Sequence, residues 1–194
     1  MRLLLFLSLL WCTAVQAQDS WRQAVMDMAP GCRIRVSVPA DAQVGFGREN
    51  RGSGSIRITH PPRAKKLSYE EPLTLGFICL DIANEAVQSG WATKNIEGSW
   101  RLNLSPHDKT YYKPCNIAVY EVANPNASGW AVHVDDMIGE KRGRRRQLFY
   151  CVTHKEKAVC GDSFMGYLPE INRHSNNDLT PYALRILRSI EFLE

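Results

Sequence analysis

The stretch RRQLFYCVTHKEKAVCGDSFMGYL, residues 145–168, decides the fold, because two alternating runs flank one short polar turn. If Lys155 and Glu156 form a two-residue turn, residue 154 pairs with 157 and Cys151 lies directly opposite Cys160. Cysteines that face each other at a non-hydrogen-bonded pair have the Cα separation that a disulfide needs. The stretch lacks a zinc knuckle, a Cys-x-x-Cys redox motif and a base placed for a cysteine nucleophile. We therefore predict an antiparallel hairpin bridged by Cys151 and Cys160.

The segments just before this hairpin predict an antiparallel meander. Two alternating runs, CNIAVYEVA (115–123) and WAVHVDD (130–136), are bounded by the turn-rich stretches NPNASG (124–129) and IGEKRG (138–143). Turn signals at such regular spacing are typical of strands that neighbour each other in the sheet. Three alternating segments predict strands in the first half: RIRVSVP (33–39), GSIRITH (54–60) and SWRLNLS (99–105).

Three other segments predict helices. Asp19 or Ser20 can cap a short helix over residues 20–28. Residues 73–89 carry apolar side chains at helical spacing and favour a helix ending at Gly90, although LTLGFICL at their start also fits a buried strand. A C-terminal helix has Thr180 as its N-cap and Pro181 as its first residue, with an apolar stripe facing the sheet.

Together these segments predict an α+β domain. We expect an antiparallel sheet of six to eight strands with helices packed on one face, the C-terminal helix closing the core. The final helix and tail, YALRILRSIEF (182–192), follow a long meander and resemble the close of small periplasmic domains of the Mog1/PsbP-like sandwich type. Some of those domains are immunity proteins of bacterial toxin systems, so the resemblance implies an α/β sandwich that binds a toxin.

The first residues, MRLLLFLSLLWCTAVQA, predict an exported protein. A basic residue, a short apolar run and a small-residue ending at Ala17 are typical of a signal peptide cleaved after residue 17. The apolar run is too short to span a bilayer, which takes about 20 residues. Residues 18–194 are then one domain in the periplasm or secreted, without a membrane span. The formal net charge of +4 is too mild to imply nucleic acid as a partner.

Export places the cysteines beyond residue 17 in an oxidising compartment, where disulfides are expected. Besides Cys151 and Cys160 these are Cys32, Cys79 and Cys115, and any one pairing leaves one thiol free. The sequence leaves that pairing open. The apolar run around Cys79 favours this residue as the buried free thiol.

Exposed arginine is the strongest functional signal in the sequence. The turn EKRGRRR groups five cations, and four more arginines fall on the polar phase of their strands. If those strands are neighbours, the open face of the sheet carries a row of guanidinium groups suited to an acidic partner. The predicted partner-binding residues are Lys141, Arg142, Arg144, Arg145, Arg146, Arg33, Arg35, Arg57 and Arg101.

One further pair, His133 and Asp135, lies two residues apart on one face of a predicted strand. Asp135 could orient His133 as a general base, or the two could bind a cation. We expect instead a solvated strand face opposite Trp130, Val132 and Val134, because the sequence places no nucleophile or third ligand nearby. Neither a cofactor nor a metal is predicted.

These patterns lead to three hypotheses. The first is an exported, non-enzymatic protein that binds another protein, in its concrete form an immunity protein or inhibitor occluding a toxin or enzyme. The second is a periplasmic hydrolase or metal-dependent enzyme that uses His133 and Asp135. The third is a binder of an anionic envelope ligand.

Overall fold

The protein is mostly β-structure in the computed structural model. The structure describes residues 20–46, 52–62, 71–88, 90–113 and 115–193, so the predicted signal peptide lies outside the described residues. Strands make up 50% of the described part and helices 19%, with twelve strands in three antiparallel sheets and four short α-helices. The predicted α+β class with helices packed on one face is therefore wrong, although the long antiparallel sheet at its centre is present.

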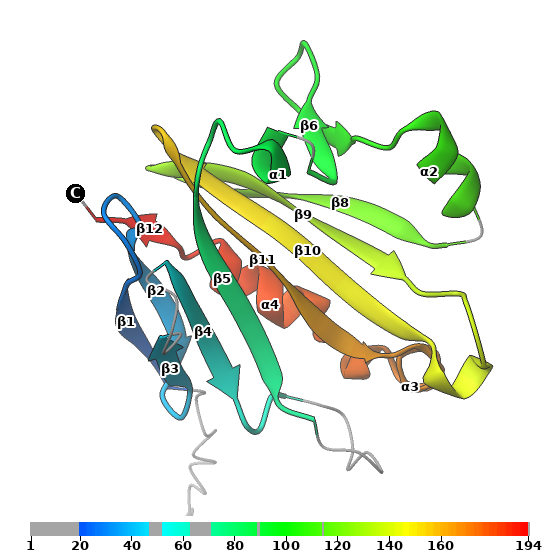
Figure 1. Cartoon of the computed structure of the whole chain (residues 1–194). Coiled ribbons are helices and arrows are strands. Elements are labelled where there is room, and N and C mark those ends of the chain that lie inside the picture. The colour runs from blue at the N-terminus through cyan, green and yellow to red at the C-terminus, as the bar shows by residue number, and fades with distance from the viewer. Residues whose placement is uncertain (1–19, 47–51, 63–70, 89, 114, 194) are drawn as a thin grey trace, which may run out of the picture.

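Seven strands form the main sheet, which runs diagonally through Figure 1. In spatial order they are β3 (Gln43–Phe46), β4 (Ser53–Ile58), β5 (Leu73–Asp81), β11 (Lys157–Tyr167), β10 (Arg145–His154), β9 (Ala127–Asp135) and β8 (Ile117–Asn124). The predicted meander is confirmed, because β8 to β11 neighbour each other in sequence order. Cys151 pairs with Cys160 across the turn, as the hairpin count predicts, and Lys155 in that turn has a positive φ of 51°.

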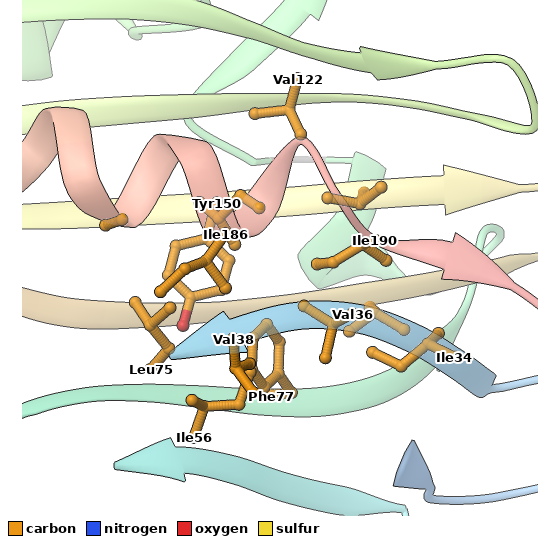
Figure 2. Close-up of a cluster of buried hydrophobic side chains, with 14 of the residues drawn as sticks. Ile34, Val36, Val38, Ile56, Leu75, Phe77, Val122, Tyr150, Ile186 and Ile190 are labelled. Atoms are coloured by element: carbon orange, nitrogen blue, oxygen red, sulfur yellow. The ribbon is translucent and has the colours of Figure 1, made fainter. Parts of the chain in front are cut away.

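A smaller sheet packs with the C-terminal helix on one face of the main sheet. Its strands, in spatial order, are β1 (Trp21–Asp27), β2 (Arg33–Pro39) and β12 (Glu191–Phe192). Two short helical segments, α3 (Leu168–Arg173) and the 3-10 turn Ser175–Asn177, lead into α4 (Thr180–Leu187). Figure 2 shows the core between these layers, where Val36 of β2, Phe77 of β5 and Ile186 of α4 converge; all are at most 1% exposed.

The opposite face of the main sheet is covered by an excursion between β5 and β8. It contains α1 (Glu85–Gln88), the strand pair β6 (Ala92–Lys94) and β7 (Trp100–Leu102), and α2 (Pro106–Tyr111), and it lies along the β8 side of the sheet in Figure 1. Trp130, Val132 and Val134 of β9 pack in a second apolar cluster under it. β9 is therefore buried on both faces.

Two predicted helices are strands. Within the predicted helix 20–28 lies β1, which pairs with β2 from Trp21 to Asp27, and within 73–89 lies β5, which pairs with both β4 and β11. In β5 the inward residues Leu73, Leu75 and Phe77 alternate with outward ones, the period of a strand. Pairing on both sides outweighs local helical spacing here. The C-terminal helix is confirmed, with its N-cap at Leu179 rather than Thr180.

Two disulfides stabilise this arrangement. Cys151–Cys160 bridges the β10–β11 hairpin, and Cys32–Cys79 links the smaller sheet to the main sheet. Among the described cysteines, Cys115 is the free one. The prediction that Cys79 is the free thiol is therefore wrong; Cys79 faces Cys32 because β5 is a strand whose inward side meets the smaller sheet.

Candidate binding site

A groove of about 480 Å³ opens where the excursion meets β9 and β10. Trp91 comes from the start of the excursion, Tyr111 and Tyr112 from the end of α2, and Arg145 and Phe149 from β10. Val134 of β9 and Ile138 of the β9–β10 link add apolar surface. The volume lies in the range of ligand-binding sites in proteins, about 300–1,000 Å³. Its walls are mainly aromatic.

The aromatic side chains hold one another in place. Trp91 stacks on Phe149 with ring centroids 4.7 Å apart and an interplanar angle of 20°. Tyr112 meets Trp91 edge-on at 5.1 Å, and Tyr111 meets Tyr112 edge-on at 4.9 Å. Contacts of these geometries add roughly 0.5–1.5 kcal/mol each beyond area burial. The groove is therefore shaped before any ligand arrives.

Local sequence fixes the two tyrosines at the end of α2. Ser105 is the N-cap, and its side chain accepts the backbone N–H of Asp108 at 3.1 Å. The carboxylate of Asp108 in turn accepts the backbone N–H of Ser105, which completes a capping box. Pro106 is at the start of the helix. Tyr112 ends the helix with its N–H donating to the carbonyl of Asp108 at 2.8 Å. A six-residue helix thus presents both rings at a set position.

The groove is lined by one cation, Arg145, and one carboxylate, Asp136, which form no ion pair with each other. Arg145 is exposed, and its guanidinium group makes no hydrogen bond or ion pair with any other described residue. Its lining neighbour Gln147 is engaged, donating to Asp162 at 2.6 Å. Asp136 accepts the backbone N–H of Ile138 at 2.9 Å. Arg145 is therefore the cation available to a ligand in the groove.

Behind β10, on the opposite face, Arg146 forms a buried charge cluster. Its Nε and Nη2 donate to the two carboxylate oxygens of Asp135 at 2.6 and 2.8 Å, and its Nη1 donates to Asp178 at 2.7 Å. The side chains of Arg146, Asp135 and Asp178 are 11%, 8% and 17% exposed. The bond to Asp135 raises the pKa of Arg146 further above its ordinary value. The cluster fastens the loop before α4 to the central strands.

His133 lies beside this cluster, bonded to a tyrosine rather than to a carboxylate. Its Nδ1 is 2.8 Å from the hydroxyl of Tyr120, and its Nε2 is buried without a hydrogen-bond partner among the described residues. Burial, together with the charge of Arg146, lowers the pKa of His133. Burial also raises the pKa of Tyr120. The imidazole is thus neutral in the folded protein at pH 7.

Acidification is expected to destabilise the protein through His133. The unfolded chain binds a proton at His133 below about pH 6.5, the ordinary pKa of histidine, whereas the folded chain resists it. The free energy of unfolding therefore falls as the pH drops below this value. Urea unfolding from pH 7 to pH 5 should show a smaller fall for His133→Gln than for wild type. His174→Gln, at an exposed histidine, serves as the control, and equal pH dependence in all three proteins would contradict this assignment.

The structure separates the predicted partner-binding residues. Lys141, Arg142 and Arg145 are exposed, and Arg144 is half-buried, in or next to the β9–β10 turn. Arg146 is wrongly predicted as exposed: it has the same inward phase as Leu148 and Tyr150 and is held by carboxylates. Arg142 pairs with Glu140 at 2.7 Å.

The predicted row of guanidinium groups does not form. Arg33 and Arg35 lie on β2 of the smaller sheet, where they pair with Asp27 and Glu191. Arg57 lies on β4 of the main sheet and Arg101 on β7 of the two-stranded sheet. The prediction required neighbouring strands, and β2, β4 and β7 belong to three different sheets.

The predicted solvated face with His133 and Asp135 is also wrong. Both residues lie on one face of β9, as expected, but are 4% and 6% exposed. Both oxygens of Asp135 accept from Arg146, and Asn116 donates to one of them at 3.2 Å. The carboxylate is therefore engaged away from His133. Within the described residues, no group of three His, Cys, Asp or Glu side chains is arranged to hold a metal ion.

The sequence prediction missed the aromatic lining of the groove. Trp91, Tyr111 and Tyr112 belong to a polar excursion, and Phe149 lies in β10 some forty residues later. A usable signal is present: large aromatic residues recur in the segment 91–112, which is otherwise largely polar apart from the alternating run at 99–105. Such residues need an apolar surface to pack on, here the outer face of β9 and β10.

The chain was compared with known families and proteins. No protein-family model matches it, and no curated protein matches it either. None of the helices in the described part has the length and apolar character to cross a membrane.

Proposed function

We propose that this is an exported, non-enzymatic protein that binds another protein through the aromatic groove. The observation that carries the proposal is the unpaired guanidinium of Arg145 beside the aromatic wall of exposed Tyr111 and half-buried Trp91 and Tyr112. Tryptophan, tyrosine and arginine are the residues that most often dominate binding energy in protein interfaces. Tyr111 and Ile138, at 53% and 58% exposure, leave apolar surface that a partner would cover.

Export fits the two disulfides, which are typical of oxidising compartments. We place the protein in the periplasm, consistent with the predicted signal peptide. There the concrete form of the function is an immunity or inhibitor role, in which the β9–β10 turn and the groove beside it occlude a toxin or enzyme. The bridged hairpin and the Arg146 cluster support such a role, because they make β10 a rigid strand behind the contact surface.

Reversing the charge at Arg145 should abolish partner capture. Protein immobilised with Arg145→Glu is expected to lose a partner that wild type retains from periplasmic extract, because a buried charge-assisted contact is worth about 1.5–3 kcal/mol, roughly 10- to 100-fold in affinity. Arg57→Glu, an exposed arginine on β4 outside the groove, is the matched control and should capture normally. A partner that both variants retain equally would contradict binding through the groove.

A further inference from the structure

We infer that the partner segment in the groove is an acidic peptide stretch with a large aromatic or apolar anchor. This inference rests on the proposed function and adds the chemistry of the occupant. The shape of the groove, its charge and the hollow beside it support this inference.

The apolar part of the groove determines which kind of partner side chain can serve as the anchor. Its floor is made by Val134 and Phe149, and Trp91 is held against Phe149 by stacking, so a flat or branched apolar side chain finds aromatic surface on its sides. Tyr112 presents its ring to the same space. Aromatic side chains fit such edge and face contacts best, because they add favourable ring geometry to the burial of area.

The charge around the groove determines the charge of the partner residues on either side of the anchor. Arg145 lines the groove without a counter-ion among the described residues, and Lys141 and Arg144 lie in the adjoining turn. Of the acidic residues nearby, Glu140 pairs with Arg142. Asp136 lines the groove and accepts the N–H of Ile138, a bond that leaves its charge in place, so the cations of the groove and turn outnumber this one free carboxylate. A carboxylate can form a bidentate pair with the fork of Arg145, whereas a basic segment would leave that cation unpaired.

The extent of the hollowed surface favours a peptide over a small ligand. A second hollow of about 160 Å³ lies on the other side of the shared wall formed by Trp91 and Tyr112, and its lining includes Asn103 and Asp108. One occupant crossing that wall would fill both hollows. A small ligand held only in the larger hollow would leave the second hollow empty, whereas a peptide is long enough to reach both.

A random-peptide library displayed on phage and panned against the intact protein tests this inference. Enriched peptides are expected to combine an aromatic or large aliphatic residue with aspartate or glutamate, and to bind Arg145→Glu about tenfold or more weakly than wild type. Arg101→Glu, an exposed arginine on β7, is the matched control and should bind them normally. Bound peptide should also slow alkylation of Cys115, whose half-buried thiol lines the groove.

Three results would overturn the inference. They are enrichment of peptides without acidic residues, peptides that leave the alkylation rate of Cys115 unchanged, and no enrichment of groove-dependent peptides. These outcomes are distinguishable from failure of the proposed function. If capture of a natural partner depends on the groove but the partner inserts a basic or uncharged segment, only the acidic-peptide inference is overturned. If capture does not depend on the groove, both the inference and the proposed function are overturned.

Discussion

Replacing Arg146 with methionine is expected to lower the free energy of unfolding by about 3–5 kcal/mol, because it leaves buried carboxylates without their partner. Arg146 bonds to both oxygens of Asp135 and to Asp178, and all three side chains are at most 17% exposed. Methionine keeps the unbranched apolar stem of the side chain but removes every donor. Urea denaturation at pH 7, with the slope checked for two-state behaviour, measures the change.

The adjacent arginine provides the matched control. Arg145→Met, one position along β10 and on the other face, should change the free energy of unfolding by no more than about 0.5 kcal/mol. Replacing all three charges, with Arg146→Met, Asp135→Leu and Asp178→Leu together, should recover much of the lost stability, since a buried ion cluster is often no better than apolar packing. A cost below about 1 kcal/mol for Arg146→Met would contradict the burial of this cluster.

Removing the Cys32–Cys79 disulfide is expected to lower the free energy of unfolding by about 4 kcal/mol, as the chain-entropy model gives for a loop of this length. The two cysteines are 47 residues apart, one just before β2 and the other in β5. The bond therefore closes a long loop in the unfolded chain and lowers its conformational entropy. The double variant Cys32→Ala/Cys79→Ala, unfolded in urea without reductant, gives the value.

The hairpin disulfide is the natural comparison. Cys151 and Cys160 are only 9 residues apart, so Cys151→Ala/Cys160→Ala should cost less, about 3 kcal/mol in the same model. Cys115→Ala removes no bridge and should change stability little. Peptide mapping after alkylation should find the label on Cys115; label on Cys79 with Cys32 joined to Cys115 would contradict the pairing.

Much of the second half could be predicted from the sequence because its signals are local. A two-residue turn at Lys155 and Glu156 sets the hairpin register, and that register brings Cys151 and Cys160 together. The turn-rich stretches at 124–129 and 138–143 separate β8, β9 and β10 as predicted. The apolar stripe of α4 is readable for the same reason, since about two turns of helix contain the whole pattern.

Part of the first half could not be predicted in this way. The alternating segments that form β2, β4 and β7 were predicted as strands, but β1 and β5 are set by distant partners. Residues 73–81 have apolar side chains that suit either a helix or a strand, and β4 and β11 decide between them by pairing on both edges. The same holds for β1, which exists because β2 pairs along its whole length. The pairing of Cys79 with Cys32 follows from this and was out of reach for the same reason.

The candidate site was predicted in part. Arg145 belongs to the predicted basic turn and does line the groove, but Arg146, its neighbour, points the other way because successive residues of a strand face opposite sides. The strand phase was available in the sequence: Arg146 alternates with Leu148 and Tyr150, which are apolar and inward. The aromatic wall was not, because it is assembled from the excursion and from β10.

Photo-crosslinking from the groove tests most directly the central claim that a protein partner binds there. A photoreactive phenylalanine analogue replaces Ile138, at the rim of the groove, or Val25 on β1, an exposed apolar residue of the smaller sheet. In periplasmic extract, we expect position 138 to yield one discrete crosslinked protein that disappears with Arg145→Glu, and position 25 to yield none. No adduct at position 138, or the same adduct from both positions, would contradict it.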